Sequence, residues 1–293
     1  MDHLQHILGE PITEPEEEAF LIFSQALPSQ SLGFIDSKTS PVEITVAGRD
    51  LTIHQSRGLL TSDRKEGTTG AVIWKVTPLF AEWVASANFL FGTGLLSSDS
   101  IALELGAGVS GIVAVTLGPK VEKYLATDQD YAIRLLKQNI AENAPTPVSI
   151  NKTKTSKSKK AKLGAEKTVS SIDTLVLDWE TDSVAVLPTL LDLSDGVDLV
   201  IACDCIYNYA LIEPLNTTCA DICRLRTNSP MKPTVFLIAQ QLRLPEVFED
   251  WLKSFHRLFH VFRVPDQLLT EPLREGSGFV VHIGILRSPG SCD

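Results

Sequence analysis

The sequence predicts an α/β protein with a doubly wound, mostly parallel β-sheet and helices on both of its faces. Two observations carry this prediction. From residue 100 onward, short apolar runs alternate with helical stretches, and a glycine-rich segment, Gly106 to Gly111, directly follows the first of these runs. Strands separated by helices at this spacing form right-handed βαβ crossovers, and a glycine turn between strand and helix is where such sheets bind ligands.

Composition sets limits on the class of protein. The chain has 293 residues, 44% hydrophobic and 21% charged, with a net charge of −10 that argues against non-specific nucleic-acid binding. No apolar run approaches the roughly 20 residues of a membrane span, so we expect no membrane partner. The N-terminus lacks a secretory signal, and the five cysteines, Cys203-x-Cys205 included, form no CxxC pair. We therefore expect a cytoplasmic protein, with the nucleus as the alternative.

Residues 1–68 are predicted to form an accessory region that precedes a larger domain of residues 69–293. Its acidic start predicts a helix over 10–27. Two alternating segments, Val42–Val46 and Leu51–His54, predict a β-hairpin. A polar, Gly-rich stretch predicts a loop over 56–70. Apolar residues at helical spacing then predict a helix that contains Leu79, Phe80, Trp83, Val84, Ala87 and Leu90.

Seven strands are predicted in the larger domain. They are Ile101–Leu105, Lys123–Thr127, Thr174–Leu177, Val197–Cys203, Thr234–Ala239, His260–Val264 and Gly278–Leu286. The helices between them are expected near 110–118, 130–143, 208–226 and 245–259. The last two strands have only a loop between them and can form an antiparallel hairpin at one edge of the sheet. Seven strands with an antiparallel last strand is the outline of the class I (Rossmann-like) methyltransferases rather than of the dehydrogenases.

An insert of residues 145–170 interrupts one crossover and is predicted to be a disordered surface loop. Between residues 151 and 167 it holds seven lysines and one glutamate, a net charge of +6. Because the whole chain has a net charge of −10, the rest of the chain carries −16. Contact of the insert with ribosomal RNA is an alternative, but a merely solvated insert is favoured over it. The acidic remainder suits a basic protein partner or a cationic cofactor.

The segment Glu104-Leu105-Gly106-Ala107-Gly108 is the predicted cofactor loop. Glycines let the backbone approach a ligand, and the start of the next helix offers amide groups there. By itself this loop fits NAD, FAD or S-adenosylmethionine equally, or a turn needed only for packing. Asp128 ends the second strand, where its carboxylate can accept hydrogen bonds from both hydroxyls of a ribose. A helix N-cap is its competing role.

Two tryptophans are candidates to line the cofactor. Trp179 follows the third strand beside Asp178, so its ring can flank an adenine while the acid accepts a hydrogen bond from the exocyclic amine. The alternative for Trp179 is a core position. Trp74 can cover the cofactor from the N-terminal side, and for this residue core and site are equally good interpretations.

Asp204 and Tyr207 follow the fourth strand and are the predicted catalytic pair. Methyl transfer from a sulfonium is an in-line displacement, so catalysis consists mostly of alignment. A lysine substrate must also lose its proton, and apolar surroundings favour the neutral amine. Asp204 can orient the amine, and Tyr207 can form a wall of the lysine channel. Cys205 and Ile206 stand where methyltransferases of flipped bases need two prolines, which counts against a direct nucleic-acid substrate.

Taken together, these motifs resemble the seven-β-strand protein-lysine methyltransferases of methyltransferase family 16, and within it the fungal enzymes that modify ribosomal proteins. The segments that carry the resemblance are 69–74, 103–112, 127–129, 177–180 and 204–208. The resemblance covers residues 69–143 and 174–216 well and the last strands loosely. The resemblance does not place the first 68 residues or the lysine-rich insert, so it indicates the reaction type more firmly than the substrate.

The resemblance implies S-adenosylmethionine as cofactor and a protein substrate. It implies that the cofactor site is lined by Trp74, Gly106 to Gly108, Asp128, Trp179 and Cys203. It further implies that Asp204 and Tyr207 receive the target lysine and that the activity is monomethylation of a lysine on the L-one protein of the large (60S) ribosomal subunit. A lysine methyltransferase with a non-ribosomal substrate, an NAD-dependent oxidoreductase and a catalytically idle scaffold stay open as alternatives. No metal site is expected, and no sequence feature demands a dimer.

Overall fold

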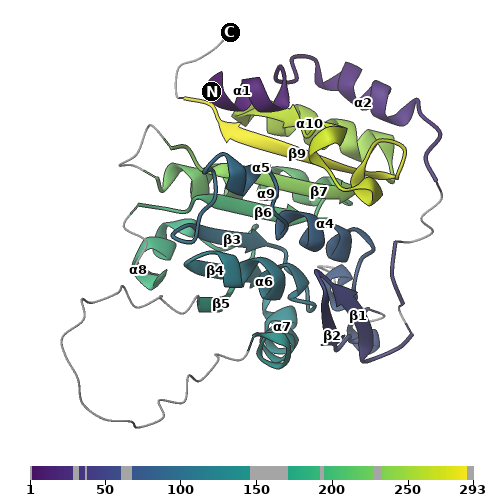
Figure 1. The fold of residues 1–293 in the computed structure, drawn as a ribbon, viewed down its shortest axis with the longest axis vertical. Coiled ribbons are helices and arrows are strands. Elements are labelled where there is room, and N and C mark those ends of the chain that lie inside the picture. The colour runs from purple at the N-terminus through teal and green to yellow at the C-terminus, as the bar shows by residue number, and fades with distance from the viewer. Residues whose placement is uncertain are drawn as a thin grey trace, which may run out of the picture.

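A seven-stranded sheet forms the centre of the molecule in the computed structural model (Figure 1). The structure describes residues 2–28, 33–36, 38–60, 68–145, 171–191, 195–226 and 232–288. The strands are β3 (Ile101–Leu105), β4 (Lys123–Asp128), β5 (Ser171–Val176), β6 (Leu199–Cys203), β7 (Val235–Gln241), β8 (Phe259–Arg263) and β9 (Phe279–Leu286). Their order in the sheet is β5-β4-β3-β6-β7-β9-β8. The predicted α/β fold with seven strands is confirmed.

Only β9 runs against its neighbours. The pairs from β5 through β7 are parallel, whereas β9 pairs antiparallel with both β7 and β8. The expected hairpin of the last two strands is therefore present, but β9 inserts between β7 and β8, and β8 forms the edge. The strand order reverses between β3 and β6. Ligands of open α/β sheets bind at such a switch point, outside the carboxyl ends of the strands.

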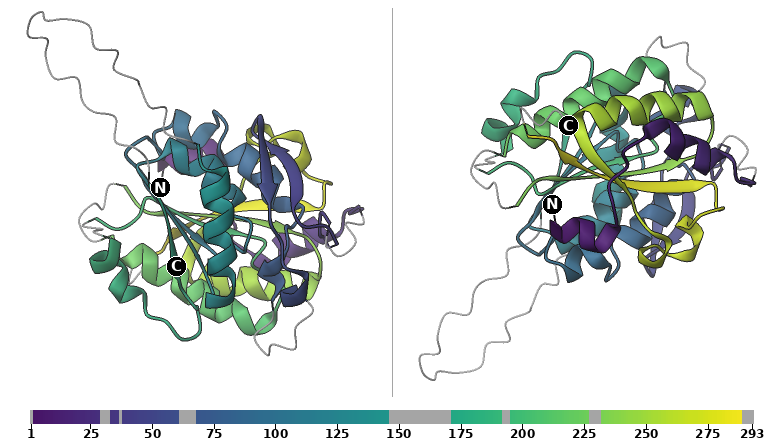
Figure 2. Two further views of the ribbon diagram at one scale, coloured as in Figure 1. Left: turned by 90° about the horizontal axis from the view of Figure 1, so that it is seen from below. Right: turned by 90° about the horizontal axis from the view of Figure 1, so that it is seen from above.

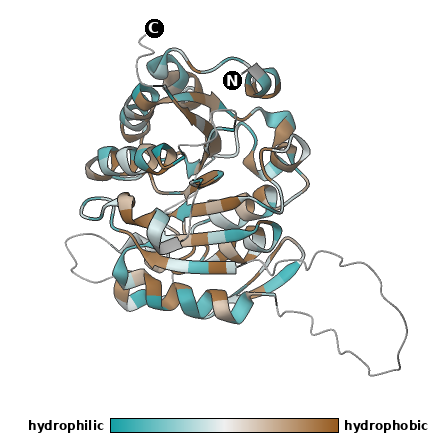
Figure 3. Ribbon diagram, turned by 90° about the vertical axis from the view of Figure 1, so that its left-hand side faces the viewer, coloured by the Kyte–Doolittle hydropathy of each residue, from teal (hydrophilic) through white to brown (hydrophobic). Residues whose placement is uncertain are grey.

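Helices cover both faces of the sheet, as Figure 2 shows. The α-helices described from residue 76 onward are α4 (Val76–Val84), α5 (Phe89–Gly92), α6 (Ile112–Leu117), α7 (Asp130–Asn143), α8 (Leu187–Leu191), α9 (Ile212–Arg224) and α10 (Pro245–Leu258). Short 3₁₀ turns lie at Thr69–Ala71, Gly118–Lys120, Val184–Val186, Tyr209–Leu211, Asp266–Leu268 and Glu271–Leu273. Hydrophobic and hydrophilic residues alternate along the flanking helices in Figure 3, as expected for helices with one buried face.

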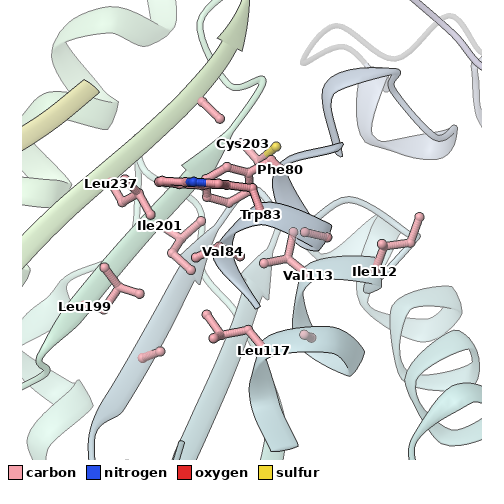
Figure 4. Packing of buried hydrophobic residues seen from close by; sticks show 14 of the residues in the cluster. Phe80, Trp83, Val84, Ile112, Val113, Leu117, Leu199, Ile201, Cys203 and Leu237 are labelled. Atoms are coloured by element: carbon pink, nitrogen blue, oxygen red, sulfur yellow. The ribbon is translucent and has the colours of Figure 1, made fainter. Parts of the chain in front are cut away.

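The sheet separates two hydrophobic cores because alternate residues of a strand point to opposite faces. On β6, Leu199 and Ile201 belong to the core under α4 and α6, whereas Val200 belongs to the core under α9 and α10. Figure 4 shows the first core, in which Phe80 and Trp83 of α4 lie against β6 and β7. The five residues of β6 are all buried. This burial on both faces holds the end of the strand in a fixed place at the switch point.

The N-terminal region crosses the edge of the sheet and then forms a hairpin. Helix α2 (Pro15–Phe23) confirms the helix predicted over 10–27 but is shorter at both ends, and α1 (Asp2–Leu8) was not predicted. Pro15 explains the late start of α2, because proline favours the first turn of a helix. Between the helices, the amide of Ile12 donates to the carbonyl of Val261 (2.7 Å). This bond occupies part of the exposed edge of β8, which would otherwise be open to pairing.

The hairpin consists of β1 (Val42–Val46) and β2 (Arg49–Ile53), joined by Ala47 and Gly48, both with positive φ. Two positive φ angles define the tight turn that suits hairpins, so β2 begins two residues earlier than predicted. The side chains of Asn143 and Asn139 on α7 each exchange two hydrogen bonds with the backbone, Asn143 with Thr52 of β2 and Asn139 with His54 directly after β2, all at 2.9 Å. The hairpin is thereby attached to α7.

Two other predictions need correction. The predicted helix from Leu79 to Leu90 is interrupted, because Asn88 caps α5 by accepting from Leu90 N (3.0 Å) and donates to the last carbonyls of α4. Within the predicted loop 56–70, residues Arg57–Leu60 form the short helix α3. The prediction of disorder over 145–170 lies outside the described residues, except for Pro145. No helix in the described ranges is long and apolar enough to cross a membrane.

Candidate active site

A cavity of about 840 Å³ lies at the carboxyl ends of β3, β4 and β6. Every residue singled out from the sequence as a site residue borders it. These residues are Trp74, Glu104, Gly106, Ala107, Gly108, Asp128, Asp178, Trp179, Cys203, Asp204 and Tyr207. They come from the ends of four strands and from the segment before α4, so the sheet brings together residues up to 133 positions apart.

The glycine loop needs its glycines for backbone conformation and for close contacts. Gly106 and Gly108 have φ of 64° and 61°, a region that disfavours side chains. A Cβ on Gly106 would lie 2.7 Å from Cys205 Sγ, and one on Gly108 would lie 3.0 Å from the carbonyl oxygen of Gly70. The amide of Val109 donates to that same carbonyl (2.8 Å). The loop is therefore locked against the segment before α4, with its backbone lining the cavity.

Asp128 ties the end of β4 to the glycine loop. Its Oδ2 accepts from Gly108 N (2.8 Å), and its Oδ1 accepts from Gln129 N (2.7 Å). Burial raises the pKa of this carboxyl to about 6, although both backbone bonds act to lower it. The alternative of a helix N-cap was wrong, because Gln129 occupies the N-cap position of α7 and no side chain caps that helix.

Glu104 is a buried acid whose partner was not identified from the sequence. It is 2% exposed, and Tyr124 on β4 donates to its Oε2 (2.8 Å). Burial raises the pKa of Glu104 to about 7; the bond from Tyr124 lowers it, and the nearby Asp128 raises it. The cavity therefore contains two carboxyls, Glu104 and Asp128, whose pKa values lie close to neutral pH because water is excluded from them.

Trp179 and Asp178 form the β5 side of the cavity. Trp179 is half-buried, and its ring lies so close to Gly106 that a Cβ there would approach it to 3.1 Å. Asp178 accepts from the side-chain amide of Gln129 (2.9 Å) and from Glu180 N (2.9 Å). The core and site alternatives for Trp179 coincide here, since the ring packs partly on the core and also borders the cavity.

Trp74 borders the cavity in an orientation fixed by two contacts. Its Nε1 donates to the carbonyl of Thr69 (3.0 Å), and its ring packs against Phe34 with centroids 4.9 Å apart. The guanidinium carbon of Arg243 lies 5.0 Å from the centroid of the Trp74 ring, within the range of a cation–π interaction. Trp74 is thus a wall of the site that also contacts a cation.

Asp204 has an unusual backbone and a paired side chain. Its φ is 60°, and Ala47 is the other non-glycine residue with positive φ in the described ranges. Arg243 donates to both carboxylate oxygens at 2.7 Å, and Gln241 N donates to Oδ1 (3.2 Å). The Asp204 side chain is 1% exposed. The carboxylate that was predicted to meet a lysine is therefore already bound by an arginine that was not predicted.

Tyr207, Cys203 at the end of β6 and Cys205 two residues later also border the cavity. Tyr207 Oη accepts from Thr69 Oγ1 (2.9 Å), and burial raises the pKa of this phenol. Cys203 and Cys205 are buried, and burial raises the pKa of both thiols. All three groups are therefore neutral near pH 7 and add no charge to the cavity.

Several residues of the site were not predicted. Tyr131 belongs to none of the sequence motifs, but it borders the cavity and its hydroxyl accepts a hydrogen bond from Gly70 N (3.2 Å). Its position three residues after Asp128 is a signal that could have identified it. Arg243 lies two residues beyond the end of β7, at the same edge of the sheet as the other strand ends. That position could have identified it, but only once β7 was known to lie next to β6.

The arrangement fits a cofactor that carries a ribose and an adenine. Asp128 borders the cavity with acceptor positions beyond its two backbone bonds, which suits ribose hydroxyls. Gly106 and Gly108 leave space that a Cβ would fill, and the Trp179 ring offers a flat apolar surface. Asp204 and Tyr207 border the same cavity, so a second substrate held by them would meet the cofactor directly.

Comparison with known families gives a match over most of the chain. Residues 53–244 match the sequence model of the lysine methyltransferase family. A ribosomal lysine N-methyltransferase 5 of Vanderwaltozyma polyspora is 31% identical over 270 residues, which cover 77% of this chain and 82% of that protein. The matched region includes the glycine loop, Asp128, Trp179, Asp204 and Arg243.

Two further similarities concern larger proteins. A diaminohydroxyphosphoribosylamino-pyrimidine deaminase of Schizosaccharomyces pombe is 27% identical over 248 residues, which cover 84% of this chain. The chain spans about half the length of that relative, 52%. Among solved structures, a tRNA (uracil-54, C5)-methyltransferase of Pyrococcus abyssi in complex with S-adenosyl-L-homocysteine aligns with a TM-score of 0.40 at 15% identity, covering 84% of this chain and 44% of that chain.

Proposed function

The chain belongs to the lysine methyltransferase family, and we propose that it transfers a methyl group from S-adenosylmethionine to one lysine of a ribosomal protein of the large subunit. The observation that carries the proposal is the single cavity bordered both by the glycine loop with Asp128 and by Asp204 with Tyr207. A cofactor and a side chain held by these two groups of residues would meet in it. S-adenosylmethionine, the cofactor of the family, supplies a methyl group on a positively charged sulfur.

The cofactor half of the cavity consists of the residues nearest β3, β4 and β5. Asp128 would accept hydrogen bonds from the ribose hydroxyls, the carboxylate of Asp178 would accept one from the adenine amine, and Trp179 would cover the adenine ring. Trp74, Glu104, Ala107 and Cys203 border the same volume. Burial raises the pKa of the Cys203 thiol, so the thiol stays protonated; it would pack against the cofactor without competing for the methyl group.

The lysine half lies at the end of β6. Only a neutral amine has the lone pair that takes up the methyl group, so the incoming ammonium must first release its proton to water. The bond between the methyl carbon and sulfur would then break as the bond between nitrogen and carbon forms, with S-adenosylhomocysteine as the leaving group. Asp204 orients the amine, and the ring of Tyr207 forms a wall of the channel. Tyr207 is held through Thr69, the first residue of the turn whose Gly70 contacts the glycine loop. The alignment of amine and methyl group then accounts for most of the rate enhancement.

The choice of a ribosomal substrate rests on the relatives and on charge. The relatives named ribosomal lysine N-methyltransferase 5 are 28–31% identical to the chain. The net charge of −10 favours encounter with a basic protein. We propose monomethylation of the L-one protein of the large subunit, in the cytoplasm. A non-ribosomal basic protein is the second candidate, and the family membership removes the oxidoreductase from consideration.

Labelled S-adenosylmethionine and purified large-subunit proteins provide the test. The wild-type chain should label one band, and mass spectrometry should find one methyl group on one lysine of the L-one protein. A label on other proteins alone would replace the ribosomal substrate while leaving the enzyme class intact. A chain that binds the cofactor by calorimetry but labels no protein would contradict the proposal.

A further inference from the structure

We infer that Arg243 is a positioning residue which, by neutralising Asp204, lets the bound target lysine lose its proton. The inference rests on the proposed function and names a residue that acts on the lysine through Asp204. It starts from the contacts of Asp204. The Arg243 guanidinium donates two hydrogen bonds of 2.7 Å, one to each carboxylate oxygen. Such a two-bond pairing fixes both the charge and the orientation of the carboxylate.

The free acceptor capacity of Asp204 is small and directional. Oδ1 accepts from Arg243 and from Gln241 N, whereas Oδ2 accepts from Arg243 alone among the described residues. Each carboxylate oxygen has two acceptor positions, so one position remains, on Oδ2. Asp204 borders the cavity with a side chain that is 1% exposed, and the proposed role requires that an amine in the cavity donate one hydrogen bond to that position. The amine is oriented by the bond, but it does not meet an uncompensated negative charge.

The charge compensation determines the protonation of the lysine. A carboxylate within about 4–6 Å of an ammonium raises its pKa by 1–3 units, which would keep the amine protonated and unreactive. An arginine stays charged at every relevant pH, so the Asp204–Arg243 pair has no net charge. Burial of the amine then dominates and lowers its pKa. Asp204 must orient the amine and must not stabilise its ammonium form. The Asp204–Arg243 ion pair meets both requirements.

Arg243 is itself held from several sides. It donates to Gln241 Oε1 (3.2 Å), and its guanidinium lies over the Trp74 ring. Gly33 lies against it so closely that a Cβ there would approach Nη2 to 2.9 Å. Its side chain is 23% exposed, so the cation is largely but not wholly removed from water. These contacts give the guanidinium one orientation, which a charge acting only at the surface would not need.

Other ionisable groups around the site do not replace Arg243. They are Glu104 and Asp128 from β3 and β4, Cys203, Cys205 and Tyr207 from the end of β6, and Tyr131, Asp178 and Glu180, which also border the cavity. The thiols and the Tyr207 phenol have raised pKa values and are neutral. Glu104 and Asp128 titrate near pH 7 and pH 6, but they do so in the wild type and in an Arg243 variant alike. A difference between the two pH profiles therefore isolates the contribution of Arg243.

The test compares wild type with Arg243→Met and Arg243→Lys in single-turnover methylation of the L-one protein between pH 6 and pH 10. Methionine keeps the length and the contact with Trp74 but removes the charge, whereas lysine keeps the charge. In Arg243→Met, the pH at which the rate reaches half its maximum should rise by about one unit or more. In Arg243→Lys it should rise less. Arg257→Met removes an exposed ion pair with Glu213 and should leave the profile unchanged.

A second measurement reads the amine directly. L-one protein that the wild type has methylated with a ¹³C-labelled methyl group is bound to each variant with S-adenosylhomocysteine, and the methyl NMR signal is titrated with pH. The pKa of the bound methyl-lysine should be higher in Arg243→Met than in wild type. Equal loss of rate at every pH, with an unchanged amine pKa, would assign Arg243 a merely structural role and overturn the inference. If the wild type labels no ribosomal protein, the proposed function is wrong and the inference falls with it.

Discussion

Two ion pairs at opposite ends of β6 use the same chemistry for different purposes. Asp198 directly precedes the strand and pairs with Arg226, which lies before β7, whereas Asp204 directly follows the strand and pairs with Arg243, which lies after β7. Both aspartates are largely buried. At the amino end, Asp198 Oδ2 also accepts from Ile101 N (2.8 Å), and Oδ1 pairs with Lys232 (3.0 Å).

The difference lies in the backbone and in what each pair faces. All of the bonds of Asp198 connect the sheet to its own neighbouring segments, so this pair serves to hold β3, β6 and β7 in register. Asp204 instead has a left-handed backbone and borders the cavity. Strain of this kind costs about 1–3 kcal/mol and persists where the surrounding structure enforces it, typically at functional sites. The Asp198–Arg226 pair therefore stabilises the fold at the amino end of β6, whereas the similar Asp204–Arg243 pair serves the reaction at the carboxyl end.

Replacement of Asp204 should have the largest effect on activity. Asp204→Ala removes the acceptor that orients the amine, so methyl transfer should fall by at least about 100-fold. Calorimetry should find cofactor affinity unchanged within a few fold, because the cofactor half of the cavity is left in place. Retention of more than a tenth of the wild-type rate would show that the lysine is oriented by other groups, with Tyr207 the first to be considered.

Replacement of Asp198 should affect stability instead. Asp198→Ala leaves the buried Arg226 without its acid and Ile101 N without its acceptor, which should lower the free energy of unfolding by about 3 kcal/mol. Denaturant titration measures this loss. The methylation rate per folded molecule at 20 °C should stay at the wild-type value. If Asp198→Ala lost activity while keeping normal stability, the ion pair at the amino end of β6 would also serve catalysis, and the proposed difference between the two ends would be wrong.

Lowering the pH should weaken cofactor binding through Asp128, a residue of the cavity. Burial raises the pKa of Asp128 to about 6, and its protonation removes an acceptor for the ribose. Cofactor affinity, followed by calorimetry, should therefore fall roughly tenfold between pH 7 and pH 5. Asp128→Asn should bind weakly and should lack this Asp128-dependent fall. A wild-type affinity that stays constant down to pH 5 would contradict this account.

The same group has the opposite effect on the stability of the empty protein. The pKa of Asp128 in the folded chain lies above the ordinary value of 3.8. The folded state then binds this proton more tightly than the unfolded state, so the contribution of Asp128 to stability is fully present below pH 3.8 and is lost as the pH rises through 6. The cavity thus binds its cofactor best in the pH range where Asp128 stabilises the fold least.

The smallest effect is expected from the exposed partner at the amino end. Lys232 is 39% exposed, and Asp198 keeps Arg226 and Ile101 N when this lysine is removed. Lys232→Ala should therefore change the free energy of unfolding by less than about 1 kcal/mol and leave activity unchanged. Thermal unfolding beside Asp198→Ala gives the comparison. A loss as large as that of Asp198→Ala would mean that the lysine, not Arg226, neutralises the acid.

Much of the site could be predicted because parallel strands bring their carboxyl ends to one edge. The strands from Ile101 onward have strongly apolar patterns, and Gly106, Asp128, Trp179 and Asp204 each follow one of them directly. Once the fold is an open parallel sheet, these residues must be neighbours. The boundaries that failed were those determined by single polar side chains, such as Asn88, which ends one helix and begins the next.

By itself, the sequence determined the fold class, the family and the residues around the cavity, because these depend on periodicity and on residues placed directly after strands. The tertiary structure alone decided which of these residues are already bound. In the structure, Asp204 accepts hydrogen bonds from Arg243, Glu104 accepts one from Tyr124, and Asp128 accepts one from Gly108 N. Such pairings depend on the order of strands in the sheet and on burial, which determine the charge and orientation of each group and which no spacing along the chain records.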